Sequence, residues 1–315
     1  MKKISVVISA YNEEKKIEDC LKSVVWADEI ILVDNSSDDA TAKIAQKYTS
    51  KIFTQPNRQM LNTNKNYGFS KATGDWIISL DADERVTPEL KKEIESRIPS
   101  ARAQGEGKNQ ESRINGYWVP RKNIIFGKWI QSDMWWPDYQ LRFFKNGKGK
   151  FPEKHVHEYI EITGETARLK EPLIHYNYSS LAQFLYKMDK IYTEDEANRI
   201  LVSHRKLGWI DAIRFPIDDF LKTFFARKGY RDGLHGLVLS FLQAFYAEIV
   251  FVKVWEKQGF IQKEYDKNFL HNIGREFKKI SNEFKYWLLT SFMEEAGNLF
   301  KRILYRLLRK YHKKD

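Results

Sequence analysis

Three carboxylates occupy four consecutive positions after the apolar run WIISL: Asp81, Asp83 and Glu84. No lysine or arginine follows until Arg85. Because like charges repel at this spacing, a cation from outside the chain would explain the cluster. Mg²⁺ and Mn²⁺ prefer oxygen ligands and complete their coordination with substrate phosphates. The alternative is that Asp83 and Glu84 only belong to the start of the next helix.

The elements that must position these carboxylates alternate between strand and helix. Continuous apolar runs predict buried strands over 4–10, 29–33 and 76–80, with a short strand over 51–54. Helical spacing of apolar residues predicts helices over 13–25, 39–48 and 61–72. Alternation of this kind implies a doubly wound α/β sheet, with parallel strands and right-handed crossovers. Ligands of such sheets bind beyond the carboxyl ends of the strands.

Polar motifs stand at three of these carboxyl ends. The first strand runs into AYNEE from Ala10, the second into DNSSDDAT from Asp34, and the fourth into DAD from Asp81. In a doubly wound sheet all three motifs lie along one edge. Asn, Ser and Asp also cap helices, which is an alternative for Ser37 and Asp38 but not for the third motif. In an Asp-x-Asp at a strand end, one carboxylate can face a ribose while the other reaches a divalent cation.

The remaining chain divides by its pattern. Short aromatic strands are expected from residue 116 to about 175, and helices dominate from about Ser180. We therefore predict an α/β domain over 1–178 and a helical region over 179–315. The single cysteine, Cys20, lies in an apolar helical pattern and is expected to be buried; it excludes an internal disulfide and suits a reducing compartment. No signal-peptide pattern follows Met1, which predicts a cytoplasmic protein.

The net charge of +11 points to a polyanionic partner. The last fifteen residues, KRILYRLLRKYHKKD, place Leu304, Leu307, Leu308 and Tyr311 on one helical face among basic residues. Such a helix suits an anionic membrane surface, although its apolar face could instead pack on its own domain. No nucleic-acid motif accompanies the charge, so a nucleic-acid partner is not expected. The apolar segment 234–255 contains Gln243, Glu248 and Lys253, which favours a core or interfacial helix over a membrane span.

The strand-end motifs together resemble the inverting family 2 glycosyltransferases of the GT-A fold. The landmarks are ISVVISAYNEE, VDNSSDDAT and GDWIISLDADE, in this order over residues 4–84. A closer resemblance, to the branch containing lipopolysaccharide-core β-1,4-glucosyltransferases, extends to about residue 255 through WPDYQLRFF, KHVHEYI, LIHYNY and GYRDGLHG. The resemblance implies a GT-A fold, a mostly parallel doubly wound sheet, followed by a helical extension.

The resemblance also implies a donor site. Ala10, Tyr11 and Glu13 would border the nucleotide, Asp34 would bond the uracil edge, Asp81 would lie at the ribose and Asp83 would bind Mg²⁺ or Mn²⁺. Many relatives have two aspartates where this chain has Asp34-Asn35. Further donor contacts are expected from Asn57, Arg58 and Lys65. For a late histidine in the metal shell, His157 is the first choice and His175 the second.

Inverting transfer is a single displacement at the anomeric carbon, so it requires a carboxylate that deprotonates the acceptor hydroxyl. Asp138 looks like this base, unless it is only a turn former beside core tryptophans. Contacts with the acceptor or with phosphate are expected from Trp135, Trp136, Gln140, Arg142 and His175. Gln140 and Arg142 alternate along a predicted strand and so share one face, although Arg142 could instead form a surface ion pair.

The function implied is transfer of glucose or another hexose from a UDP-sugar to a glycolipid or lipid-linked saccharide of the cell envelope. The enzyme would depend on a divalent cation and act peripherally at the inner face of the membrane. One alternative is a transferase that glycosylates a polyprenyl phosphate. Another is a non-catalytic nucleotide-binding scaffold on the membrane, and a third is a nucleic-acid-binding protein.

Overall fold

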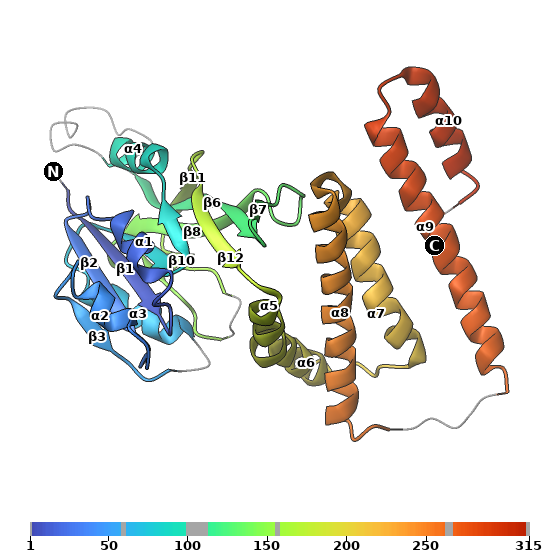
Figure 1. Cartoon of the computed structure of the whole chain (residues 1–315), viewed down its shortest axis with the longest axis horizontal. Helices are drawn as coiled ribbons and strands as arrows, with labels where there is room; N and C mark the ends of the chain where they lie inside the picture. The colour runs from blue at the N-terminus through green and yellow to red at the C-terminus, as the bar shows by residue number, and fades with distance from the viewer. Residues whose placement is uncertain (1, 58–60, 99–112, 155–157, 262–266, 313–315) are drawn as a thin grey trace. The chain divides into compact units, whose positions relative to one another are not determined.

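The computed structural model describes residues 2–57, 61–98, 113–154, 158–261 and 267–312 (Figure 1). The chain divides into two compact units. Unit 1 contains residues 1–129 and 136–180, and unit 2 contains residues 130–135 and 181–315. Unit 1 is an α/β structure and unit 2 is helical, which confirms the predicted fold class. The domain boundary between 178 and 179 stays a prediction.

Unit 1 is built on one mixed sheet with the order β3-β2-β1-β4-β8-β6-β12-β5. Its parallel half consists of β1 (Ile4–Ala10), β2 (Glu29–Asp34), β3 (Ile52–Thr54) and β4 (Trp76–Asp81). Its other half consists of β8 (Asp138–Lys145), β6 (Ile114–Ile125), β12 (Leu173–Tyr178) and β5 (Glu84–Val86). β8 runs antiparallel to both β4 and β6, while β12 runs parallel to β6 and antiparallel to β5.

Short strands complete unit 1. β7 (Lys128–Trp129) and β11 (Glu165–Arg168) both pair with β6, and β9 (Gly149–Lys150) pairs with β10 (Glu161–Ile162) in a separate sheet. The sequence pattern predicts separate aromatic strands for YWVP and IIFGKWI; the end of IIFGKWI turns at Phe126-Gly127 into β7, whereas YWVP and Ile124-Ile125 belong to one strand, β6. Continuous pairing of β6 with β8 on one side, and with β11 and β12 on the other, keeps this segment in one strand.

Helices flank the sheet, and two of them are shorter than expected. The helices of unit 1 are α1 (Ile17–Lys22), α2 (Thr41–Ala45), α3 (Leu61–Lys71) and α4 (Pro88–Arg97), against the expected 13–25 and 39–48 for the first two. The residues before α1 and α2 are held in loops that hydrogen-bond to one another. The Glu13 N–H donates to Thr41 Oγ1 at 2.8 Å, and the Asn12 N–H donates to Ser37 Oγ at 3.0 Å. Side chains bonded to backbone groups in this way compete with helix formation.

The register of the parallel strands brings the predicted motifs to one edge. Ala10 is opposite Asp34 across β1 and β2, and Ser9 is opposite Asp81 across β1 and β4. Because β8 is antiparallel to β4, its first residue, Asp138, lies toward the same edge. The expectation that the strand-end motifs share one edge is therefore confirmed.

Aromatic packing fixes the centre of this sheet. The ring of Phe143 on β8 stacks on Trp76 of β4 and on Tyr117 of β6, with centroid distances of 4.6 and 5.6 Å. All three side chains are buried. Offset stacking adds to the apolar area that these rings remove from water, so it holds β8 between β4 and β6. Cys20 is also buried, as expected, and its burial raises the pKa of the thiol.

Unit 2 consists of helices and the short segment 130–135. Its α-helices are α5 (Leu181–Lys187), α6 (Thr193–Val202), α7 (Trp209–Leu221), α8 (Leu234–Lys257), α9 (Phe269–Glu295) and α10 (Leu299–Arg309). Two π-helical turns (Met188–Tyr192 and Lys222–Ala226) and a 3₁₀ turn (Gly229–Asp232) join them. The carboxylate of Asp232 accepts hydrogen bonds from the N–H groups of Gln131 and Ser132, which ties the short segment to the helices.

Two contacts organise the long helices of unit 2. The Arg214 guanidinium on α7 forms ion pairs with Glu276 and Glu283 on α9. Helix α8 packs against α6 and α7 through Leu239, Ala247 and other small or apolar side chains. In the described residues, α8 is the one helix that is long and apolar enough to cross a membrane. Whether it enters a bilayer stays a prediction.

Substitution of Gly68 by alanine should destabilise unit 1, because α3 packs closely on β1 and β2 there. A Cβ at Gly68 would lie 2.5 Å from Val7 Cγ1 and 2.8 Å from Val33 Cγ2. We expect Gly68→Ala to lower the free energy of unfolding by about 1 to 3 kcal/mol, measured by urea titration. The control is Gly274→Ala on α9, where no atom lies within 4 Å, and the expected change is small or stabilising. Equal effects of the two substitutions would contradict this packing.

Candidate active site

The loops after β1 and β2 form one part of the site. Ala10 is buried, Tyr11 is exposed and Glu13 is half-buried. Asp34 is buried, and both of its carboxylate oxygens lie 3.3 Å from the N–H of Ser37. The Asp34 carboxylate thus closes its own turn, and its bond to a uracil edge stays a prediction.

Asn35 is placed at the point where β1, β2 and α3 approach each other. Its side-chain amide donates to Ser9 Oγ at 3.1 Å and accepts from Asn64 Nδ2 at 2.7 Å. Asn64 also donates to the carbonyl of Pro56 at 2.9 Å. Both asparagines are buried, and an aspartate at position 35 could accept from Asn64 but could not donate to Ser9 Oγ. The sequence did not single out Asn64, because its role depends on contacts between elements distant in the chain.

Asp81 is neutralised from within the chain. Its carboxylate forms ion pairs with Lys65 Nζ at 2.5 Å and with Arg142 Nη2 at 2.6 Å. Burial works to raise the pKa of Asp81, but Arg142 and Lys65 hold this pKa well below its usual range. Asp81 is therefore ionised at neutral pH. Lys65 lies beside the carboxylate cluster, as expected of a donor-site residue, although its contact with a donor stays a prediction.

The interpretation of Glu84 as a helix-start residue is wrong. Glu84 is fully buried in β5, and the next helix begins at Pro88, where Thr87 is the cap. One oxygen of Glu84 pairs with Arg142 at 2.7 Å, and the other accepts from the Asp81 N–H at 3.0 Å. The sequence pattern missed this role because β5 has only three residues and its partner strand, β12, is distant in the chain.

Basic residues that are distant from these carboxylates along the chain therefore lie close to them in the structure. Arg142 is buried between Asp81 and Glu84 rather than at the surface, and its contact with phosphate stays a prediction. Lys16 Nζ lies 3.9 Å from Asp83 Oδ2. The argument that the cluster needs an external cation for neutrality is thus wrong for Asp81 and Glu84. A cation bound at Asp83 stays a prediction.

Asp138 begins β8 and is held by three side chains. Arg121 Nη2 lies 2.6 Å from Asp138 Oδ2, and Asn123 Nδ2 donates to the same oxygen at 3.1 Å. Gln140 Nε2 donates to Asp138 Oδ1 at 2.9 Å, so positions 138 and 140 share a face of the strand. Burial works to raise the pKa of Asp138, but Arg121, Gln140 and Asn123 together lower it. Asp138 is therefore an ionised carboxylate, and its Oδ1 accepts fewer hydrogen bonds than its Oδ2.

Hydrogen bonds join Asp138 to Asn123 and Asn123 to His175, and His175 then approaches Asp83 at a distance longer than a hydrogen bond. Asn123 and His175 are neighbours across β6 and β12, and His175 Nδ1 lies 2.6 Å from Asn123 Oδ1. Because the amide nitrogen of Asn123 donates to Asp138, its oxygen faces the imidazole, so Nδ1 of His175 must carry a proton. The other ring nitrogen, Nε2, lies 3.6 Å from Asp83 Oδ1. Arg121 and Asn123 were not predicted as site residues, since their role depends on strand pairing.

The residues around Asp83 fit a divalent cation that a substrate helps to hold. In the neutral Nδ1–H tautomer, His175 Nε2 and the Asp83 carboxylate both present lone pairs to the space between them. Within the described residues, no three His, Cys, Asp or Glu side chains form a closed metal site. Mg²⁺ commonly uses one or two protein ligands together with water and substrate phosphates. His157, the first-choice ligand, and Arg58 both lie outside the described residues.

The two tryptophans before Asp138 belong to different units. Trp136 is half-buried in unit 1 and meets Trp129 edge-to-face, with centroids 5.4 Å apart. Trp135 belongs to unit 2, where its backbone N–H donates to the Ser132 carbonyl at 2.8 Å. Stacking of either ring on a sugar stays a prediction.

Removal of the Arg142 guanidinium should destabilise unit 1 in a pH-dependent manner. Arg142→Gln leaves Asp81 and Glu84 without their shared cation, for which we expect a loss of about 3 to 5 kcal/mol at neutral pH. The lowered pKa of Asp81 contributes stability that is present above its unfolded pKa and is lost as the pH falls through the folded value. The difference between wild type and variant should therefore shrink below about pH 4.

Urea unfolding at both pH values checks this expectation. Arg113→Gln removes an equal charge from an exposed position of unit 1 and should change stability little. A loss in Arg142→Gln that is the same at neutral and acidic pH would contradict the electrostatic account.

Solved structures and curated proteins similar to the chain include several glycosyltransferases. Over 263 residues the chain is 25% identical to the lipopolysaccharide core biosynthesis glycosyltransferase LpsC of Rhizobium meliloti, covering 81% of this chain and 93% of that protein. It is 28% identical to an uncharacterized glycosyltransferase of Rickettsia prowazekii, covering 78% and 84% of the two chains. The Staphylococcus aureus TarS fragment 1–349 in complex with UDP-GlcNAc is 17% identical, covering 82% and 92%, with a TM-score of 0.43.

The family model described as Glycosyl transferase family 2 matches residues 5–190 of the chain. Apart from Ile4, the first residue of β1, this range includes the described strands of unit 1, and it contains Asp81, Asp83, Glu84 and Asp138. It also accounts for more than half of the 315 residues. The chain therefore belongs to glycosyl transferase family 2.

Proposed function

We propose that this glycosyltransferase is metal-dependent and inverting, and that it transfers glucose or another hexose from a UDP-sugar to a saccharide acceptor on a lipid. The observation that carries the proposal is the row of side chains from Asp83 through His175 and Asn123 to Asp138, in which hydrogen bonds join the last three and His175 Nε2 lies 3.6 Å from Asp83 Oδ1. It links a carboxylate suited to the donor side with one suited to the acceptor side. The strand-end position of the site agrees with where open α/β sheets bind ligands.

Asp138 is the proposed base. Its Oδ1 would accept the proton of the acceptor hydroxyl, while the hydroxyl oxygen forms a bond to the anomeric carbon and the bond from that carbon to the diphosphate breaks. UDP leaves with the electron pair of that bond. Arg121 and Asn123 hold Oδ2, so the orientation of the carboxylate is set before the acceptor arrives. The lowered pKa keeps Asp138 ready to accept a proton at neutral pH.

The donor side would be formed by Asp83 and His175 with a divalent cation, Mg²⁺ or Mn²⁺. When bound, such a cation offsets the negative charge that develops on the departing diphosphate. The neighbouring lysines, Lys16 and Lys65, would add positive charge at the same edge. The loops that begin at Ala10 and Asp34 would enclose the nucleotide.

The acceptor is proposed to be a glycolipid or lipid-linked saccharide of the cell envelope, because LpsC is described as an enzyme of lipopolysaccharide core biosynthesis. The alternative acceptor is a polyprenyl phosphate, and product analysis with each acceptor distinguishes the two. A non-catalytic scaffold would release no UDP. We further propose a cytoplasmic location, with peripheral association at the inner face of the membrane.

Substitution of Asp138 by asparagine should remove catalysis and spare donor binding. We expect the rate of sugar transfer in Asp138→Asn to fall by about 100- to 10,000-fold, because the acceptor hydroxyl loses its base. UDP-sugar should still raise the melting temperature, since the donor side is unchanged. The control Asp19→Asn changes an exposed aspartate of α1 and should leave both measurements unaltered. Full transfer activity in Asp138→Asn would rule out this base.

Substitution of His175 by glutamine tests the metal ligand without an activity assay. The measurement is the Mn²⁺ concentration at which UDP half-maximally raises the melting temperature. We expect this concentration to rise at least about tenfold in His175→Gln, as for losses of residues that support a metal site. Asp83→Ala should abolish the metal-dependent part of the stabilisation. His204→Gln, at an exposed position, is the control, and an unchanged concentration in His175→Gln would exclude this histidine as a ligand.

A further inference from the structure

Helix α10 packs on α9 through its polar and aromatic side. Tyr305 meets Phe292 with ring centroids 5.5 Å apart, and the Arg309 guanidinium lies 5.2 Å from the ring centre of Tyr286. Arg302 Nε donates to the carbonyl of Ala296 at 2.9 Å. These contacts define the side of α10 that faces the rest of unit 2.

The apolar side of α10 therefore faces away from α9. Successive residues of an α-helix are rotated by about 100°, so Leu307 lies nearly opposite Tyr305. In agreement, all of the large apolar residues on this side are exposed, with 43 to 77% of Leu299, Phe300, Ile303, Leu304, Leu307 and Leu308 accessible. The sequence left open whether this face packs on its own domain, and in the structure it does not.

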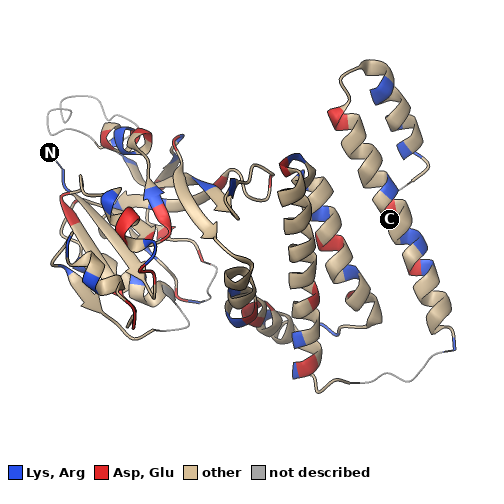
Figure 2. Cartoon of the chain, viewed as in Figure 1, with Lys and Arg blue, Asp and Glu red and all other residues tan. Residues whose placement is uncertain are grey.

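Positive charge borders the outward face. Lys301, Arg302, Arg306, Arg309 and Lys310 belong to α10 or its cap, and no acidic residue occurs from Gly297 to His312 (Figure 2). A second copy of α10 placed on this face would bring two such basic clusters together, which is unfavourable. An anionic surface would be attracted by them instead.

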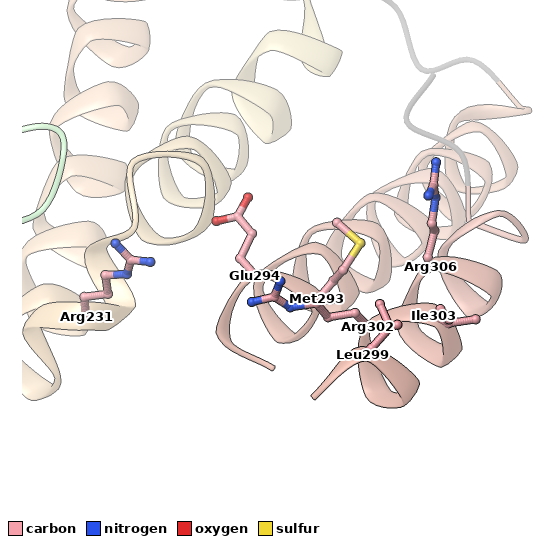
Figure 3. A pocket seen from close by; sticks show the side chains of 7 residues that line it. All are labelled: Arg231, Met293, Glu294, Leu299, Arg302, Ile303 and Arg306. Atoms are coloured by element: carbon pink, nitrogen blue, oxygen red, sulfur yellow. The ribbon is translucent and has the colours of Figure 1, made fainter. Parts of the chain in front are cut away.

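A cleft of about 510 Å³ lies beside α10 (Figure 3). Three arginines line it, Arg231, Arg302 and Arg306, with Glu294 as the one acidic residue. Leu299 and Ile303 of the outward face, with Met293, supply its apolar lining. Arg231 is paired with Glu295 at 2.8 Å, whereas Arg306 forms no ion pair with the described part of the chain. Guanidinium groups next to apolar side chains suit a phosphate that is attached to hydrocarbon.

We infer that α10 is the membrane contact of the chain, with its outward apolar face inserted into an anionic leaflet and lipid phosphates bound at Arg302 and Arg306. Amphipathic helices bind in this way through buried apolar area together with attraction to anionic lipid. The inference assigns a surface to the proposed membrane location. It does not depend on the catalytic proposal, because UDP release in solution measures that separately.

Flotation of the full chain with vesicles tests the insertion. The wild type should float with vesicles of equal parts phosphatidylcholine and phosphatidylglycerol, and much less with phosphatidylcholine alone. The double variant Leu304→Asp/Leu308→Asp should bind at least about tenfold less, since two acidic groups replace two inserted side chains. Both positions are exposed, so the fold should be kept, and thermal unfolding checks this. The matched control Val25→Asp/Val202→Asp introduces the same two charges at exposed apolar positions elsewhere and should float like the wild type.

A second pair of variants tests the arginines. Arg302→Gln/Arg306→Gln should reduce binding to the anionic vesicles by about tenfold or more, because each basic residue near the surface contributes to the attraction. The control Arg275→Gln/Lys278→Gln removes the same charge from exposed positions of α9 and should have a smaller effect. Equal losses in both pairs would overturn the assignment of the phosphates to the cleft.

The oligomeric state provides the competing outcome. If α10 instead joined two copies of the chain, light scattering would show a dimer that Leu304→Asp/Leu308→Asp converts to a monomer, and the wild type would not float. That result would overturn the inference. Flotation of the wild type, its loss in the α10 variant and its retention in the matched control together support it.

Discussion

The buried guanidinium of Arg142 is the group on which the carboxylate edge of unit 1 depends. It is placed between Asp81 and Glu84, and both carboxylates hold the pKa of the arginine above its usual value against the effect of burial. A charge removed from water is tolerated only when partners replace the lost hydration. Arg142 thus joins β8 to the end of β4 and to β5, two strands that do not pair with each other. The Asp81 carboxylate stays ionised in this buried position because Arg142 and Lys65 lower its pKa.

The insertion of β8 between β4 and β6 has a second consequence for the site. It places Asp138 opposite Arg121, and the parallel pairing of β6 with β12 places Asn123 beside His175. The antiparallel pairing of β12 with β5 then places His175 opposite Glu84, the residue after Asp83. Residues from four strands therefore form one polar row. A hydrogen-bonded row of this kind orients its members more firmly than separate contacts would.

Unit 2 uses charge and apolar surface differently. Its interior is held by an ion-pair cluster, in which Arg214 joins α7 to α9 through Glu276 and Glu283. A usual amphipathic helix packs its apolar side inward, whereas the last helix of unit 2 leaves its apolar side exposed. In α10 the aromatic and basic side contacts α9, and the leucines are left exposed. Because of this arrangement, the unit suits a surface that offers both hydrocarbon and negative charge.

The sequence by itself determined the parallel strands, the shared edge of their motifs, the burial of Cys20 and the candidacy of Asp83 and Asp138. The strands, their shared edge and the burial of Cys20 follow from local patterns, because continuous apolar runs make buried strands and polar residues after them must lie at the carboxyl edge. Asp83 and Asp138 became candidates through the resemblance to the glycosyltransferase family. Only the tertiary structure decided that Arg142 is buried beside Asp81, that Glu84 is part of the same cluster and that Asn123 and His175 connect Asp83 to Asp138. It also decided which way α10 turns its leucines. Periodicity shows that a face exists, but what that face meets is determined by the pairing of strands and helices distant in the chain.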